Sequence, residues 1–210
     1  LFQVDTVGGI VKYDFSKPLV KPEHLVDVEA GISYRSAHVF LAGNVFWMEF
    51  YDELIKKGQV DIFGQPVTGN AERTRHIGIE AEGQWFIGKG LSFYSNATVM
   101  RNRLVRYAVF QTVGGSVQRI SLNGNPIAGS PDYLLNMAMK YETENFDLAL
   151  KGKYVGEFYT DNTKNPLLKN DAYWVWNFVG NVRIAFSNGV DCTVHGEVRN
   201  LFNALYTMNG

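Results

Sequence analysis

The chain has few cysteines, no long apolar run and almost no net charge, and each shortage excludes a class of protein. Cys192 is its single cysteine, so no internal disulfide can form. No segment reaches the roughly 20 consecutive apolar residues of a membrane-spanning helix, which excludes a helical membrane protein. The formal net charge of −1 over 210 residues gives no argument for nucleic acid as a partner.

The sequence is instead rich in aromatic residues, which make up 14% of it, and in glycine, with 21 residues. Both suit β-structure with many turns. Apolar and polar residues alternate with a period of two, so each strand has one apolar and one polar face. In His24–Tyr34, for example, Val26 and Val28 share one face while Asp27 and Glu29 share the other.

This alternation predicts eight antiparallel strands, of which the second is apolar on both faces and is hard to orient. They span about His24–Tyr34, His38–Tyr51, Thr74–Phe86, Leu91–Asn102, Tyr133–Glu142, Phe146–Tyr159, Tyr173–Ser187 and Val190–Asn200. The connections between them alternate in length. Short turns lie near Arg35–Ala37, Ile87–Gly90, Thr143–Asn145 and Ser187–Gly189, and long loops cover roughly Asp52–Arg73, Arg103–Asp132 and Thr160–Ala172.

Short turns on one rim and long loops on the other are typical of an outer-membrane barrel. Aromatic residues such as Trp85 and Phe93 gather beside the short turns, and Trp174 and Trp176 lie toward the other rim, as in two interfacial belts. We therefore predict an all-β fold, an antiparallel up-and-down transmembrane β-barrel with lipid outside and a wet lumen. A soluble one-sided antiparallel sheet is the alternative, and the loop asymmetry and the belts favour the barrel.

Four motifs occur in order along the chain. They are Lys21–Glu23 followed by Val26–Gly31, Asn70–Arg75 followed by Ile77–Glu80, Asn123–Pro131, and Val198–Asn203 followed by Tyr206. Together these motifs resemble those of the TonB-dependent outer-membrane receptors, and they cover nearly the whole chain.

This resemblance implies about eight consecutive strands, the fourteenth to the twenty-first, of a larger 22-stranded barrel with a plugged lumen. Residues 1–210 are then the C-terminal portion of the barrel, without the plug domain and the final strand. Because open sheet edges do not survive in lipid, we expect these residues to be part of a longer polypeptide.

The resemblance also implies the function of an active importer, not of an enzyme. The receptor would bind a large, scarce solute, such as a siderophore, haem, cobalamin, a glycan or a peptide, at the surface of a Gram-negative bacterium. Import would use energy delivered by TonB–ExbB–ExbD through the plug. Other expected partners are outer-membrane lipid and possibly a surface lipoprotein or another outer-membrane subunit. The alternatives are a passive porin, a structural or adhesive barrel, and a soluble β-sheet binding module.

The sequence shows no catalytic, cofactor-binding or metal-binding constellation, so no cofactor is expected. Tyr107, Phe158 and Tyr159 are loop aromatics that could stack on a substrate, although belt or loop packing explains them equally well. His76 and His195 fall on the polar face and are interpreted as solvated lumen histidines.

Other polar residues are interpreted structurally. Glu80 and Glu82 lie two apart on the polar face, where we expect them to pair with lumen cations or with a plug. Arg73 and Arg75 are expected near the rim in a lumen ion network, with an anionic ligand as the alternative. Asn200 is expected to tie its strand locally to the following loop.

Overall fold

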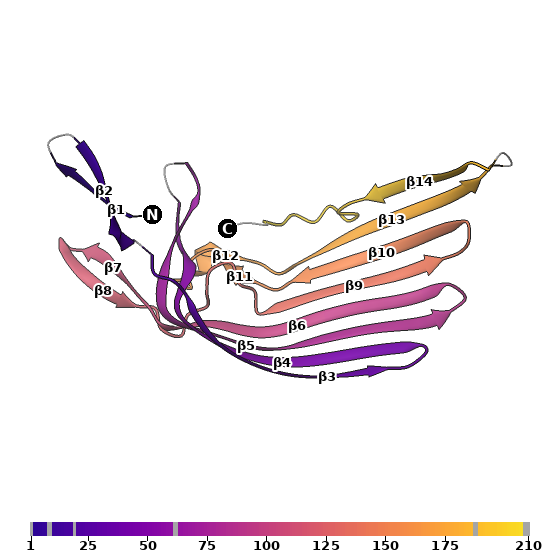
Figure 1. Cartoon of the computed structure of the whole chain (residues 1–210), viewed down its shortest axis with the longest axis horizontal. Helices are drawn as coiled ribbons and strands as arrows, with labels where there is room; N and C mark the ends of the chain where they lie inside the picture. The colour runs from indigo at the N-terminus through magenta and orange to yellow at the C-terminus, as the bar shows by residue number, and fades with distance from the viewer. Residues whose placement is uncertain (1, 8–9, 19, 61–62, 187–188, 208–210) are drawn as a thin grey trace.

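The computed structural model describes residues 2–7, 10–18, 20–60, 63–186 and 189–207 (Figure 1). Its main element is an eight-stranded antiparallel sheet in the order β14-β13-β10-β9-β6-β5-β4-β3. The strands are β3 (His24–Arg35), β4 (Val39–Val60), β5 (Pro66–Gly88), β6 (Leu91–Arg106), β9 (Tyr133–Glu142), β10 (Phe146–Val155), β13 (Tyr173–Ala185) and β14 (Asp191–Val198). Among the described residues, no helix is long and apolar enough to cross a membrane.

The smaller elements are three two-stranded pairs and one helical turn. The pairs are β1 (Phe2–Val7) with β2 (Ile10–Pro18), β7 (Ala108–Val113) with β8 (Ser116–Ser121), and β11 (Phe158–Tyr159) with β12 (Lys169–Asn170), and the turn is the 3-10 helix η1 (Pro166–Leu168). The eight long strands lie side by side in one curved layer, with the short turns at one end and the β7–β8 hairpin at the other (Figure 1). The antiparallel sheet and its eight strands are confirmed; the sheet is not closed, because β3 and β14 form its edges.

Several predicted boundaries were wrong. The predicted loop Asp52–Arg73 is largely strand, because β4 and β5 remain paired from Tyr51 opposite Arg73 to Lys56 opposite Thr68. This extension needs no apolar face toward lipid, so the alternation that marked the other strands is weak there. The β1–β2 and β7–β8 hairpins also lie where no strand was expected.

The predicted strand Phe146–Tyr159 ends at Val155, after which Gly156 turns the chain. The Gly156 N–H donates to the carbonyl of Tyr133 at 2.8 Å, and a Cβ at this position would lie only 3.1 Å from that oxygen. Phe158 and Tyr159 then pair with β12 instead of continuing along the sheet.

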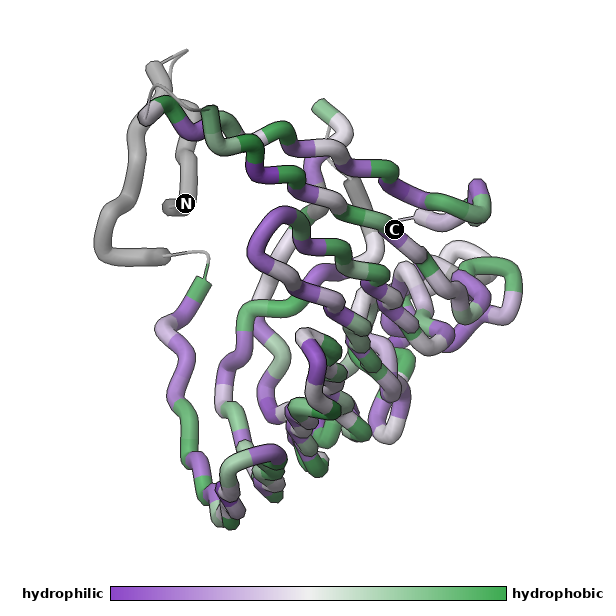
Figure 2. The backbone as a smooth tube through the Cα atoms, turned by 90° about the vertical axis from the view of Figure 1, so that its right-hand side faces the viewer, coloured by the Kyte–Doolittle hydropathy of each residue, from purple (hydrophilic) through white to green (hydrophobic). Residues whose placement is uncertain are grey.

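Strand pairing places the apolar rows on one face of the sheet, because residues directly opposite each other in an antiparallel pair share a face. Val45 lies opposite Ile79, which in turn lies opposite Val99. These rows are not covered: Ile32 is 81% exposed and Ile79 is 58% exposed. Hydrophobic and hydrophilic residues alternate along the strands in Figure 2. An apolar surface of this extent is not stable in water, so the outward face of the sheet suits hydrocarbon.

Pairing also orients β4, which the sequence left open. Val45 and Trp47 lie on the outward, apolar face, opposite Ile79 and Ile77. Phe46 lies on the inner face opposite Gly78, where a Cβ would come within 2.6 Å of its ring. Glycine therefore leaves the space that this aromatic ring fills.

The buried apolar core lies beyond the eight-stranded wall, at the end of the long connections. It consists of Ile55, Ala71, Leu104, Tyr107, Leu122 and Ile127. These residues come from the extensions of β4, β5 and β6 and from the segment that follows them. The long connections therefore pack on one another as a small core that continues from the wall.

Candidate functional site: the inner face and the long-loop rim

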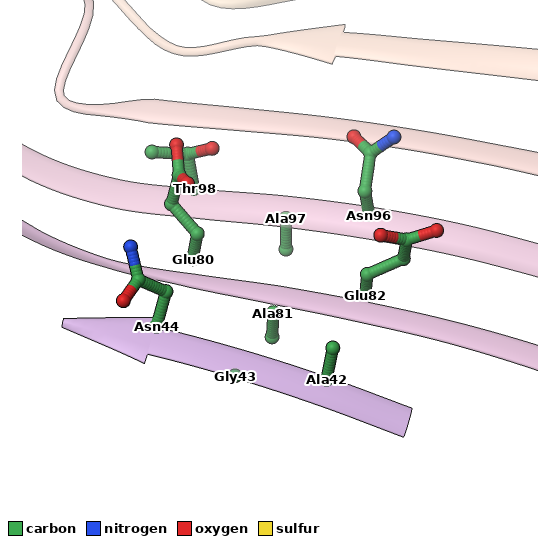
Figure 3. Close-up of a pocket in the computed structure, with 9 residues that line it drawn as sticks. All are labelled: Ala42, Gly43, Asn44, Glu80, Ala81, Glu82, Asn96, Ala97 and Thr98. Carbon is green, nitrogen blue, oxygen red and sulfur yellow. The ribbon is translucent and has the colours of Figure 1, made fainter. Parts of the chain in front are cut away.

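The inner face carries a polar hollow of about 290 Å³ formed by β4, β5 and β6. Figure 3 shows Glu80, Glu82 and Asn96 with their side chains directed to the same side of the sheet. Asn44 lies opposite Glu80 and donates from Nδ2 to Glu29 at 2.8 Å. Within the residues that the structure describes, Glu80 and Glu82 make no hydrogen bond or ion pair. Two exposed carboxylates on this inner face are thus available to cationic groups.

A hydrogen-bonded ladder crosses the inner face of β10, β13 and β14. His195 Nδ1 lies 2.6 Å from the Asn181 side-chain oxygen, and Asn181 donates to Asp147 at 2.5 Å. Arg183 donates to the other oxygen of Asp147 at 3.2 Å. Asn181 and Asp147 are half-buried, whereas His195 itself is exposed, which agrees with its interpretation as a solvated lumen residue.

His76 differs from that interpretation because its side chain is only 18% exposed. Its Nδ1 lies 2.8 Å from the Asn102 oxygen, and its Nε2 lies 3.1 Å from Glu53. Glu53 also accepts from the Thr74 hydroxyl. Glu53 follows Asp52, whose backbone is left-handed (φ 55), and its carboxylate lies on the inner face beside the imidazole ring. Both ring nitrogens therefore face oxygen acceptors, which only the doubly protonated ring can fully satisfy.

Asn162 is only 2% exposed, and its hydrogen bonds join the long connections to one another. Its Nδ2 donates to the Lys56 carbonyl at 2.6 Å, and its Oδ1 accepts from the Ala128 N–H at 2.9 Å. The Asn125 side chain donates to the Asn162 carbonyl at 2.9 Å. Three segments far apart in sequence thus form one packed rim.

A second hollow, of about 440 Å³, lies in this rim. It is lined by Arg103, Gly124, Pro126, Ser130, Asp132, Tyr133, Tyr154, Glu157, Phe158, Tyr159, Lys164 and Ala172. Two guanidinium nitrogens of Arg103 donate to the two oxygens of Asp132, at 3.0 and 2.6 Å. Next to the hollow, Lys169 donates to Glu157 at 2.9 Å, and this hydrogen bond is the main cause of the raised pKa of Lys169.

The three aromatic residues selected from the sequence occupy different positions. Tyr107 is 7% exposed and packs in the apolar core, where burial raises the pKa of its hydroxyl. Phe158 is 6% exposed, whereas Tyr159 is half-buried, and both line the rim hollow. The Arg103–Asp132 pair in the same hollow was missed, because its partners are 29 residues apart and no local motif marks them.

Arg73 and Arg75 were expected in a lumen ion network, and this placement was wrong. They lie four and two residues before Ile77 on β5, respectively, and therefore on the outward face with it. Both Nε atoms donate to Glu49, that of Arg75 at 2.8 Å, and the Glu49 side chain is only 1% exposed. The Arg75 guanidinium lies 5.9 Å from the ring centre of Trp47.

Asn200 and Cys192 lie at the β13–β14 edge of the sheet. The Asn200 side chain donates to the Ala204 carbonyl at 2.9 Å and accepts from the Ala204 N–H at 2.8 Å, which is the predicted local tie. Cys192 is exposed and lies opposite Ile184 on the apolar face. The described side chains include no group of three or more His, Cys, Asp or Glu residues placed to hold a metal ion.

An exposed apolar outward face, a polar inner face and a rim of long packed connections together define the wall of a transmembrane β-barrel. The sequence profile of the family "TonB dependent receptor-like, beta-barrel" matches residues 3–201. The chain belongs to this family of transport receptors.

Solved structures support the same fold. The ferric yersiniabactin uptake receptor FyuA from Yersinia pestis is 20% identical, with a TM-score of 0.63 over 90% of this chain and 26% of its own. The siderophore receptor PiuA from Acinetobacter baumannii is 15% identical, with a TM-score of 0.63 over 89% of this chain and 25% of its own. The copper transporter OprC is 12% identical, with a TM-score of 0.64 over 90% and 26%. The chain thus spans about a quarter of the length of these structures.

Proposed function

We propose that this chain is the C-terminal portion of the barrel of an outer-membrane import receptor in a Gram-negative bacterium. One observation carries the proposal: the outward face is apolar and exposed, while the inner face behind it carries the carboxylates Glu80 and Glu82, which pair with no other described residue. A wall of this kind separates hydrocarbon from an aqueous, ion-binding interior. Membership of the receptor family supports this reading.

The edges and the inner carboxylates indicate what the rest of the receptor supplies. The free edges of β3 and β14 would pair with further strands, because unpaired backbone groups are costly in hydrocarbon. Glu80 and Glu82 would accept hydrogen bonds from cationic side chains of a plug domain in the lumen. The plug would couple the receptor to TonB–ExbB–ExbD.

The solute would bind on the lumen side of the long connections. Of the three predicted aromatics, Tyr159 keeps the most suitable position for stacking, since Tyr107 and Phe158 are almost fully buried. The transported solute would be large and scarce. Because FyuA is a ferric yersiniabactin uptake receptor and PiuA is a siderophore receptor, we would test a ferric chelate first, before haem, cobalamin, glycans and peptides.

Uptake by the full receptor tests the proposal. In cells that carry the receptor as their only route for the solute, we expect uptake to stop when TonB is deleted. Replacing Glu80 and Glu82 together by Gln should loosen the plug, lower uptake and raise leakage of small hydrophilic solutes. Glu144→Gln, in a short turn, is the matched control and should leave both unchanged. Uptake that continues without TonB would instead identify a passive porin.

A further inference from the structure

On β5, the apolar row of the outward face ends at a defined residue on the side of the long connections. Its apolar row runs from Trp85 to Ile77, opposite Val39 and Trp47 on β4. Eight residue steps at about 3.3 Å give roughly 26 Å along the strand, and a barrel tilt of about 40° reduces this to roughly 20 Å in height. Two further steps to Arg75 raise the height to roughly 25 Å, which is about the height of the apolar band, so Arg75 lies at its edge, at headgroup depth.

Four arginines lie at or beyond this limit on two adjacent strands. Arg73 and Arg75 continue the outward row of β5. On β6, Arg101 lies opposite Ile77 and Arg103 lies opposite Arg75, which places both on the same outward face. Together they form an outward arginine cluster, consisting of Arg73, Arg75, Arg101 and Arg103, at the rim that carries the long connections.

The outward arginine cluster is only partly neutralised within the protein. Glu49 accepts from Arg73 and Arg75, and Asp132 accepts from Arg103. Four positive and two negative charges leave a surplus of two. Arg101 is exposed, and among the described residues it has no hydrogen bond or ion pair. A guanidinium without a partner is costly at the edge of a hydrocarbon band, so an anion at that depth would stabilise it.

The cluster is also held in place before any ligand arrives. Glu49 is almost completely covered, while the side chains of Arg73 and Arg75 remain 38% and 42% exposed. Arg73 lies 5.6 Å from the ring centre of Tyr51, and Arg75 lies beside Trp47. The buried carboxylate and the aromatic rings fix the stems of the guanidinium groups, so that less conformational entropy is lost on binding.

We propose that the outward arginine cluster binds the phosphate groups of an anionic lipid in the leaflet on the long-loop side. Guanidinium groups match phosphate geometry through paired N–H donors. The acyl chains would lie along the outward apolar row below the cluster. The site faces away from the lumen and is separate from solute transport.

Lipid retention by the full receptor tests this inference. Nanodiscs of phosphatidylcholine, with or without diphosphorylated lipid A, would hold the purified receptor, and native mass spectrometry would count the lipid A molecules retained. Arg101→Gln is the primary variant because, among the described residues, Arg101 makes no hydrogen bond or ion pair that its loss would break. Loss of one charged hydrogen-bonding group predicts about tenfold weaker retention. Arg101→Lys should restore part of the lipid retention, because lysine keeps the positive charge but lacks the paired N–H donors of the guanidinium group.

Arg119→Gln is the matched control, since Arg119 is exposed in the β7–β8 hairpin. Wild-type retention by Arg119→Gln together with loss in Arg101→Gln supports the site. Wild-type retention by Arg101→Gln overturns it, and so does displacement of lipid A by millimolar inorganic phosphate, which would indicate a free-anion site. Because the readout is lipid retention, failure here leaves TonB-dependent uptake unaffected, and the two proposals can be separated.

Discussion

A lysine at Ile79 should destabilise the receptor far more than a lysine on the inner face of the neighbouring strand. Ile79 is 58% exposed on the outward face. It lies six steps from Trp85 and four from Arg75, about 20 and 13 Å along the strand, and thus near the middle of the apolar band. A cation at the bilayer midplane costs about 2–4 kcal/mol. We expect Ile79→Lys to lower the free energy of unfolding by about this amount.

Thr98→Lys is the matched inner-face variant. Thr98 lies opposite Glu80, so the new ammonium would face water and the Glu80 carboxylate. Its cost should stay below about 1 kcal/mol. Asn96 serves less well as a control, because its side chain donates to the Tyr94 hydroxyl and accepts from Asn136.

The measurement is the folded fraction of the full receptor in lipid vesicles across a guanidinium series, read from heat-modifiable migration on gels. A difference of about 2 kcal/mol or more between the two variants is expected. Equal costs for Ile79→Lys and Thr98→Lys would refute the assignment of the two faces, because charge would then meet the same surroundings on both.

Three further predictions concern the rim, one short turn and the lipid face. Asn162→Ala removes two buried side-chain hydrogen bonds and should cost about 1–3 kcal/mol, seen as faster hydrogen exchange at Ala128; unchanged exchange would contradict the role of Asn162 in the rim. Gly90→Ala should lower the folded yield, because φ is +81° and the Cβ would meet the Glu142 carbonyl; a wild-type yield would argue against this turn. Cys192 should react with a membrane-permeable maleimide but not with a charged one in vesicles, and equal labelling would place it in water.

The sequence alone determined the strands of the wall and the environment of each of their faces. Side chains alternate strictly along a strand, so residues such as Val28 and Ile79 could be assigned to the lipid face without coordinates. The same alternation would have placed Arg75 on the outward face with Ile77, two residues away. It was assigned to the lumen only because charged residues were expected there. The short turn before Leu91 was also readable, because its glycines permit left-handed backbone conformations.

Only the tertiary structure decided which distant groups meet. The carboxylate of Glu49 reaches Arg73 and Arg75 because of the register between β4 and β5, which no local pattern fixes once both strands extend past the wall. Asn162 contacts Lys56 across 106 residues of sequence, and a lone asparagine gives no sign of this contact. The alternation of side chains between the two faces of a strand follows from the local backbone geometry, so it can be read from the sequence. Register and loop packing depend on contacts between segments that are remote in the chain.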